Sequence, residues 1–448
     1  MKKLFILFTV LIALASCKKS DIEVFDKKPE ERLGQSIAEV RSALLSSPSG
    51  WIATLPTFAG GGYGFYMSFD ENENVKMMGD LNITSIGTPA TSTYRLKTVL
   101  GTELIFDTFN YISLLVDPTP SVFGGAAATG YKSDVEFRHN RSTTDSIFFT
   151  GKKYGQPLVL VKATASQKTL YEGGGYKTAI DKFKAFFTNT KNPYIEYTFG
   201  NSTLKVGMSL DFNNTLVTGK RINFSGILAD GVSTAAGVAK FAFKLDGADI
   251  LGGGLVFNGI TFVKILWKDA STLAFYDKAG KEYIVKSNPI PLTPLYLLFK
   301  YNGTFKKISI GSSLPTGVNS KFNDVFQALV TRLGALSPKR TIVSISFTLT
   351  NSTTATLSVS PNNGTSTFVA NATFNYSINN DVITLSNPVY DGNWTARGTE
   401  YDGVKNFFLS GPFKIDWVSS TDPANTISIG GLYQVADPTA YYYGSLSL

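Results

Sequence analysis

The strongest constraint on the fold is a succession of short alternating segments that begins at Trp51. Apolar and polar residues alternate within each segment, and turn residues such as Asp70–Asn74 separate one segment from the next. Roughly eight such strands are predicted up to Val161, with no helical pattern between them. Parallel strands need long and usually helical connections. The succession therefore predicts antiparallel sandwich or barrel-like domains.

Three segments carry the period of an amphipathic helix instead. Pro29 opens the first, and Ser47-Pro48-Ser49-Gly50 ends it. Similar apolar stripes predict helices over 176–188 and 320–334. The remainder of the chain has the composition and alternation of strands. The predicted fold class is mainly β, with antiparallel sandwich or barrel-like domains and about three amphipathic helices.

Domain boundaries are predicted from changes in composition along the chain. Prolines alternate with other residues in Asn288–Pro294, a pattern that favours a stiff, extended connection. Residues 17–28 are polar and resemble a tether. The predicted segments are a signal peptide (1–16), the tether (17–28), a helix with an antiparallel β-domain (29–170), a second β-rich region (171–290) and a C-terminal β-domain with one helix (291–448).

The N-terminal residues have the order of a secretory signal. Lys2 and Lys3 precede an uncharged apolar run, Leu4–Leu14, and two small residues then precede Cys17, the only cysteine of the chain. The alternative of a membrane-spanning anchor needs about 20 apolar residues, which this run does not reach. A cysteine at this place resembles a bacterial lipobox. The resemblance implies cleavage before Cys17 and attachment of lipid (palmitate) to it, which would anchor the protein to a membrane.

The residues that follow Cys17 indicate to which membrane the protein is sorted. Lys18 rather than an aspartate follows Cys17, which by resemblance to known sorting rules favours the outer membrane. Asp21 and Glu23 resemble the acidic start of lipoproteins displayed at the cell surface. The expected location is the outer membrane, with surface display as the finer hypothesis.

Composition excludes several kinds of catalytic site. His139 is the only histidine, so a histidine-rich zinc site cannot form within one chain. A Ser-His-Asp triad would have to use His139, which the alternation places on a strand. The glycine run Gly60–Gly64 lacks the Lys-Ser/Thr ending of a phosphate-binding loop. No catalytic residue, metal site or cofactor is predicted.

The charge does not indicate a nucleic acid as partner. The formal net charge is +8, but pairs such as Lys152-Lys153 are short and scattered, and they do not form a stripe that follows phosphates. A basic, solvated surface explains these lysine pairs. The predicted export of the protein also argues against a nucleic acid as its partner.

Aromatic residues make up 13% of the chain and supply the candidate ligand-binding residues. Trp394 lies in a turn-like stretch beside Asp391 and Arg397, and Tyr442 is the middle residue of a Tyr-Tyr-Tyr run. An aromatic ring face stacks on the apolar face of a sugar while nearby polar groups bind its hydroxyls. Packing of both rings in a β-domain core is the alternative.

Several segments in the first third of the mature chain occur in a familiar order. The segments are Gly50-Trp51, Gly60–Phe69, Met77–Asp80, Tyr94–Lys97, Leu104–Asn110, Asp134–Phe137, Asp145–Ile147 and Gly151–Lys153. Together they resemble the exported lipoprotein family of Bacteroidota known as domain of unknown function 4302. The family is uncharacterised, so the resemblance implies a cellular location and a fold type rather than a reaction.

These observations favour a non-catalytic binding module anchored to the envelope, which captures a carbohydrate or a peptide. A structural or adhesin scaffold that binds another envelope protein is the alternative. A glycoside hydrolase that uses two carboxylates is a third hypothesis, because spacing along the sequence does not show which acids face each other.

Overall fold

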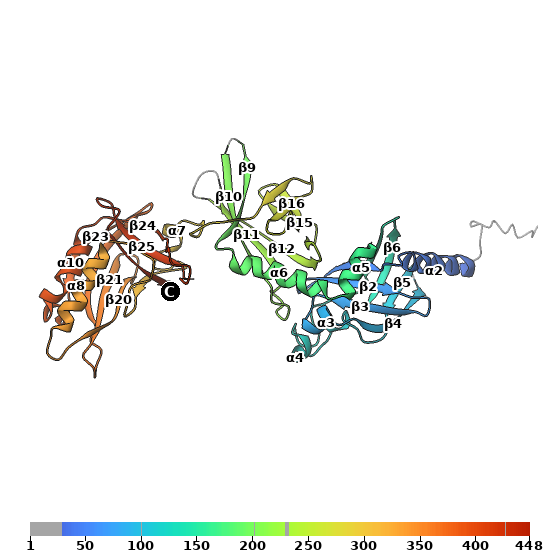
Figure 1. Cartoon of the computed structure of the whole chain (residues 1–448), viewed down its shortest axis with the longest axis horizontal. Helices are drawn as coiled ribbons and strands as arrows, with labels where there is room; N and C mark the ends of the chain where they lie inside the picture. The colour runs from blue at the N-terminus through green and yellow to red at the C-terminus, as the bar shows by residue number, and fades with distance from the viewer. Residues whose placement is uncertain (1–28, 100, 201, 229–232, 426) are drawn as a thin grey trace, which may run out of the picture. The chain divides into compact units, whose positions relative to one another are not determined.

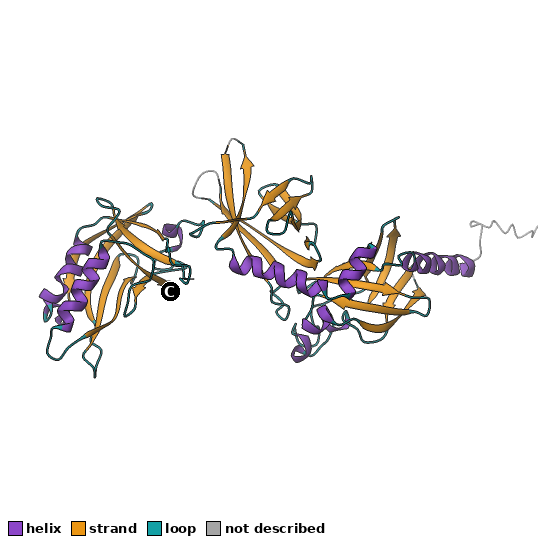
Figure 2. Ribbon diagram, viewed as in Figure 1, coloured by secondary structure: helices purple, strands orange, loops and turns teal. Residues whose placement is uncertain are grey.

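The computed structural model describes residues 29–448 except residues 100, 201, 229–232 and 426. The predicted signal peptide, Cys17 and the tether lie outside the described residues. The mainly β fold class is confirmed, because antiparallel strands form three successive sheets (Figures 1 and 2). In the part of the chain that is described, no helix has both the length and the apolar composition of a membrane span.

The chain separates into two compact units. The first comprises the chain up to Thr178 together with Asn213–Gly219, and the second comprises Ala179–Phe212 and Lys220–Leu448. The first unit holds one closed barrel. The second unit holds an open sheet and another closed barrel.

The first barrel contains eight strands in sequence order, closed by pairing of the last strand with the first. Trp51 pairs with Lys162 at this closure. Side chains alternate between inside and outside, and β7 shows this clearly because Ile147 and Phe149 are buried while their neighbours are partly exposed. The strands are β1 (Trp51–Pro56), β2 (Gly62–Phe69), β3 (Asn74–Gly79), β4 (Ala90–Thr98), β5 (Thr102–Phe106), β6 (Glu136–Ser142), β7 (Ser146–Gly151) and β8 (Pro157–Lys162).

The helix predicted after Pro29 is confirmed as α2 (Pro29–Leu45). Val40 and Leu44 bury its apolar stripe against the barrel core, and the Leu44 carbonyl accepts a hydrogen bond from Trp51 Nε1 at 2.8 Å. The other helices of this unit are α3 (Ile83–Gly87), the 3₁₀ turn η1 (Ser113–Leu115), α4 (Pro120–Phe123) and α5 (Ala165–Glu172).

The proline and glycine content of residues 117–130 predicts a long exposed loop between β5 and β6. Most of these residues are exposed, but the segment also contains the short helix α4 and is held to the barrel by a few buried residues. Phe123 is buried, Tyr131 is fully buried, and the Tyr131 hydroxyl donates to the Phe123 carbonyl oxygen at 3.1 Å. Gly124 has a φ of +87°, and a Cβ there would lie 2.1 Å from the Thr215 carbonyl oxygen. Its glycines thus permit close packing here.

The open sheet of the second unit has ten strands, and the helix predicted over 176–188 precedes it as α6 (Gly175–Asn189). Phenylalanine rings fill its core, with the Phe224 ring centroid 5.1 Å from that of Phe275 and 5.2 Å from that of Phe262. The strands are β9 (Pro193–Phe199), β10 (Ser202–Asp211), β11 (Arg221–Ile227), β12 (Thr234–Lys244), β13 (Gly247–Ile250), β14 (Leu255–Phe257), β15 (Ile260–Trp267), β16 (Leu273–Asp277), β17 (Glu282–Ile284) and β18 (Lys286–Ser287).

The second barrel again has eight strands in sequence order, closed by pairing of β19 with β26. The strands are β19 (Lys307–Ile310), β20 (Thr341–Leu349), β21 (Thr354–Asn362), β22 (Ala370–Asn379), β23 (Val382–Tyr390), β24 (Phe413–Val418), β25 (Ile429–Gln434) and β26 (Tyr441–Ser447). Its helices are α7 (Leu295–Leu298), α8 (Phe322–Gly334), α9 (Gly392–Thr395) and α10 (Gly398–Leu409). The predicted helix near 320–334 is confirmed as α8, whereas α10 was not predicted. Figure 2 shows α8 and α10 side by side.

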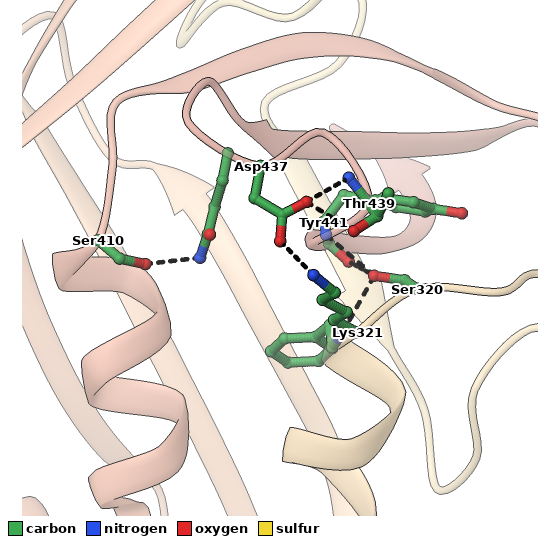
Figure 3. A network of polar contacts seen from close by, with 8 residues as sticks. Ser320, Lys321, Ser410, Asp437, Thr439 and Tyr441 are labelled. Carbon is green, nitrogen blue, oxygen red and sulfur yellow. Dashed lines mark hydrogen bonds and ion pairs between the residues drawn. The ribbon is translucent and has the colours of Figure 1, made fainter.

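A polar network joins the start of α8 to the loop between β25 and β26 (Figure 3). Lys321 Nζ lies 2.6 Å from Asp437 Oδ2, and Asp437 Oδ1 accepts hydrogen bonds from Thr439. Ser320 Oγ donates to the Tyr441 carbonyl oxygen at 2.7 Å and accepts from the Tyr441 amide at 2.9 Å. These bonds fix where α8 begins relative to the strand that closes the barrel.

Candidate functional site

A cavity of about 550 Å³ opens in the first barrel, where the chain enters β6 and where β7 turns into β8. Its volume falls within the roughly 300–1,000 Å³ of small-molecule sites. Its lining mixes acidic, basic, hydroxyl and apolar side chains. The lining residues are Val116, Ala128, Thr129, Ser133, Asp134, Val135, Glu136, Lys152, Lys153 and Tyr154.

Asp134 holds the turn that carries the basic and aromatic residues of the cavity. Its Oδ1 accepts a hydrogen bond from the Lys153 amide at 2.7 Å, and its Oδ2 accepts one from the Tyr154 amide at 3.1 Å. Gly151 makes room for this carboxylate, because a Cβ at Gly151 would lie 2.2 Å from Asp134 Oδ2. The Asp134 side chain is thereby fixed against the turn and positions Lys152, Lys153 and Tyr154.

Lys152 connects two carboxylates at the edge of the cavity. Its Nζ lies 2.7 Å from Glu136 Oε2 and 3.0 Å from Glu103 Oε2. Hydrogen bonds to Glu136, and then to Glu103, raise the pKa of Lys152 above its usual value. The sequence predicts only a solvated basic surface here, whereas the structure shows an ion-paired lysine.

Two buried polar atoms in this region have no hydrogen-bond partner among the described residues. They are the Oγ atom of Ser133, which lines the cavity, and the Oε1 atom of Glu103, whose other carboxylate oxygen is paired with Lys152. An unpartnered polar atom of this kind is unfavourable by about 1–3 kcal/mol.

An aromatic pair borders the polar lining. The Tyr154 ring stacks on the Phe58 ring with their centroids 6.3 Å apart, and the Phe58 side chain is 59% exposed. Lys153 Nζ lies 5.0 Å from the Tyr154 ring centroid, and Lys132 Nζ lies 5.7 Å from that of Phe58. The site combines an accessible aromatic surface with hydrogen-bond donors and acceptors.

Trp394 and Tyr442, the two candidate ligand-binding residues, both lie in the core of the second barrel, which is the alternative that the sequence leaves open. Trp394 is 2% exposed, and its ring packs between those of Tyr390 and Tyr401, at centroid distances of 5.5 and 5.1 Å. The stretch that the sequence suggests is a turn forms the short helix α9. Asp391 caps this helix, because its Oδ1 accepts a hydrogen bond from the Trp394 amide at 2.8 Å. This cap fixes the backbone from which the indole ring packs into the core.

Tyr442 is fully buried inside the second barrel. Its hydroxyl lies 3.0 Å from the Ile308 carbonyl oxygen and 2.9 Å from that of Ile345, and burial raises its pKa. Neither of the two predicted rings lies at the cavity. Cys17, the predicted lipid attachment site, lies outside the described residues.

His139, the only histidine with which a Ser-His-Asp triad could be built, lies in the hairpin of β6 and β7. Its Nε2 lies 2.9 Å from Ser142 Oγ within the same exposed hairpin, and burial lowers its pKa. Within residues 29–448, apart from the undescribed positions, no carboxylate hydrogen-bonds to its ring, and a triad requires one. Among those same residues, no group of three His, Cys, Asp or Glu side chains is arranged to hold a metal ion.

The cavity residues were not singled out from the sequence as a site. They lie, however, on two of the segments that carry the family resemblance, Asp134–Phe137 and Gly151–Lys153. These segments come together because β6 pairs with β7. The signal that the sequence offers is an acidic segment, Asp134-Val135-Glu136, followed by a basic pair, Lys152-Lys153.

Comparison with known proteins gives a family but no characterised relative. No curated protein matches the chain. Residues 21–269 match the family described as Domain of unknown function (DUF4302). The matched range includes the whole first barrel and therefore the cavity. Because the match covers more than half of the chain, the protein belongs to this DUF4302 family.

Proposed function

We propose that the protein is an outer-membrane lipoprotein, anchored through Cys17, whose first barrel captures a carbohydrate without catalysing a reaction. The observation that carries this proposal is the cavity at the turn after β7, where an aromatic pair borders acidic, basic and hydroxyl groups. Sugars offer an apolar ring face together with hydroxyls that both donate and accept hydrogen bonds. The Tyr154 ring can stack on the apolar face of a sugar ring. The side chains of Glu136, Lys153 and Ser133 can hydrogen-bond to the sugar hydroxyls.

A carbohydrate is favoured over a peptide because the first barrel is closed. Many peptide-binding domains add the peptide as a strand to a free sheet edge. Pairing of β1 with β8 occupies the edges of this barrel. A peptide would therefore have to bind through its side chains in the cavity alone.

Binding is favoured over hydrolysis because the acids at the cavity already have structural roles. Asp134 holds the turn, and Glu136 shares Lys152 with Glu103. A glycosidase needs one carboxyl group that is free to donate a proton and a second that acts as nucleophile or base. The arrangement is thus better suited to hydrogen-bonding a ligand.

The binding proposal is tested with the soluble chain from Lys18 onward on an array of glycans and peptides, with product formation measured in parallel. A glycan bound there is then titrated by calorimetry against Tyr154→Ala. We expect the affinity to fall at least tenfold. Tyr301→Ala is the matched control, because Tyr301 is an exposed tyrosine (43%) of the second barrel, and its affinity should equal that of the unaltered chain.

Other outcomes have definite meanings. Product formation at the cavity would replace capture with hydrolysis. If no glycan or peptide on the array binds, the alternative is favoured, namely a scaffold that binds another envelope protein. If Tyr154→Ala binds the glycan with the same affinity as the unaltered chain, the glycan does not bind at this cavity.

The lipid anchor is tested separately in cells fed a labelled palmitate. We expect label on the full chain and a membrane-bound protein, and loss of both in Cys17→Ser. A Cys17→Ser protein that retains the label would contradict anchoring through this residue.

A further inference from the structure

A second group of polar side chains, in the second barrel, has unused hydrogen-bonding capacity. Among the residues that the structure describes, four buried donor atoms of this barrel have no hydrogen-bond partner: Tyr390 Oη, Trp394 Nε1, Arg397 Nε and Arg340 Nε. Buried polar groups are nearly always paired in folded proteins, so four such atoms in one region need an explanation.

The four donors belong to one contiguous cluster. Tyr390 ends β23, Trp394 lies in α9, Arg397 is the residue that precedes α10, and Arg340 precedes β20. The Trp394 ring contacts the rings of Tyr390 and Tyr401. Arg340 and Arg397 both lie near enough to the Tyr401 hydroxyl to lower its pKa, against the larger effect of burial, which raises it.

Three cationic side chains gather in the cluster, and two acids, Glu400 and Asp391, also lie near enough to the Tyr401 hydroxyl to raise its pKa. Arg340, Arg397 and Lys405 are each partly exposed, and within the described part of the chain none of the three forms an ion pair. Lys405 Nζ lies 5.4 Å from the Tyr390 ring centroid, and Arg340 Cζ lies 4.7 Å from that of Phe368. The N-terminus of α10 adds further positive potential.

The nearest acids are engaged elsewhere. Both Asp391 oxygens accept hydrogen bonds, Oδ1 from the Trp394 amide and Oδ2 from the amide and side chain of Asn371. Glu400 Oε2 accepts from Thr399 Oγ1 at 3.0 Å. Among the described residues, no carboxylate accepts a hydrogen bond from any of the four donor atoms.

We propose that this cluster binds an oxyanion group of a ligand, a carboxylate, sulfate or phosphate, between Arg340 and Arg397. Guanidinium groups match such anions with paired, charge-assisted hydrogen bonds. Arg340 and Arg397 are partly exposed, so an anion can approach their guanidinium groups, and the buried Nε atom of each is the donor that is still without a partner. The site lies in a different sheet from the cavity of the first barrel and does not depend on the function proposed for it.

The experiment uses the soluble chain from Lys18 onward, with sodium galacturonate, sulfate and phosphate as probes and chloride at matched ionic strength as the reference. Binding is measured by calorimetry and by the shift of the thermal unfolding midpoint. We expect saturable binding of at least one probe, with a midpoint above that in chloride. The ranking of the three probes distinguishes a uronic acid from a sulfated or phosphorylated ligand.

Variants locate the site. Arg340→Gln and Arg397→Gln should each weaken binding at least tenfold. Arg141→Gln is the matched control, because Arg141 of the first barrel also stacks on a phenylalanine ring, with its Cζ 3.7 Å from the Phe148 centroid, and its affinity should be unchanged. Near-UV circular dichroism establishes that each variant is folded.

Two results would overturn the proposal. One is equal affinity in all three variants, which would place the anion elsewhere. The other is the absence of any midpoint shift or binding heat relative to chloride in the unaltered chain, which would mean that water alone satisfies the donors. The second result needs no variant, so the proposal stays testable even if Arg340→Gln and Arg397→Gln do not fold.

Discussion

Lys152 Nζ lies 3.0 Å from Glu103 Oε2, and the two side chains differ greatly in exposure. The Glu103 side chain is 1% exposed, whereas that of Lys152 is 40% exposed. The other Glu103 oxygen is buried without a partner. A buried carboxylate of the first barrel thus depends for its charge compensation on one lysine at the rim of the cavity.

Removing that lysine should destabilise the first barrel. In Lys152→Met, Glu103 becomes a buried charge without a counterion, which is strongly unfavourable. We expect a clear loss in the free energy of unfolding, measured by urea denaturation, and partial recovery in the double variant Lys152→Met/Glu103→Gln. Lys268→Met is the control, because its ion pair with Glu282 is exposed and should contribute little. Equal losses in both lysine variants would contradict this account.

Gly151→Ala should disturb the turn that carries the cavity residues. The new Cβ would lie 2.2 Å from Asp134 Oδ2, so the carboxylate must move and its hydrogen bonds to the Lys153 and Tyr154 amides weaken. We expect a loss of about 1–3 kcal/mol in unfolding free energy, as for other overpacked sites, and weaker binding of any glycan found on the array.

Gly34→Ala is the control, because it is expected to raise the free energy of unfolding rather than lower it. A Cβ at Gly34 meets nothing within 4 Å, and Gly34 lies inside α2. Alanine there should stabilise by up to about 1 kcal/mol through helix propensity. If Gly151→Ala were as stable as Gly34→Ala, the close contact with Asp134 would have no energetic role.

The ion pair between Lys321 and Asp437 predicts a pH dependence. The hydrogen bond from Lys321, and then those from Thr439, lower the pKa of Asp437 from 3.8 to about 2. A carboxyl whose pKa is lowered by folding stabilises the folded state above its unfolded pKa, and that contribution is lost as the pH falls. The thermal midpoint of Asp437→Asn should therefore lie below that of the unaltered chain at neutral pH.

This difference in midpoint should disappear between pH 3.8 and about 2. Scanning calorimetry of both proteins across that range checks it. Lys321→Met should show the same pH profile, because it removes the other half of the pair. A difference that persists below this window would assign the effect to something other than the Asp437 charge.

Tyr442→Phe should destabilise the second barrel without affecting a ligand. The hydroxyl is buried and contacts the carbonyl oxygens of Ile308 and Ile345. Its removal leaves these acceptors without that donor, at a cost of about 1–2 kcal/mol in unfolding free energy. Chemical denaturation measures the loss. An unchanged stability together with weaker glycan binding would restore Tyr442 to a ligand site.

The general fold could be predicted because its signals are local. Alternation and turn residues specify strands, and a helical stripe is visible in 29–45, 176–188 and 320–334. The helix α10 was missed although Tyr401, Val404, Phe407 and Phe408 share its buried face. Gly398 and Gly403 lower its helix propensity, and strand-like composition surrounds it, so tertiary packing decides its conformation.

The cavity could not be predicted because its residues meet through strand pairing. Glu103 lies opposite Arg138 in the pairing of β5 with β6, and Lys152 reaches Glu103 from the turn after β7. Register of this kind is not visible in alternation alone. Trp394 shows the converse case, because polar neighbours suggest an exposed turn while the cap of α9 places the indole ring in the core.

The closure of each barrel also sets when it can fold during synthesis. The first barrel has its complete set of strands once Lys162 has left the ribosome, because β8 pairs with β1. The second must wait for Tyr441–Ser447, since β26 is the strand that joins β19 to β25. Until then, two unpaired strand edges remain open to association with other nascent chains. The synthesis of β26 therefore determines how long these unpaired strand edges stay exposed to other chains.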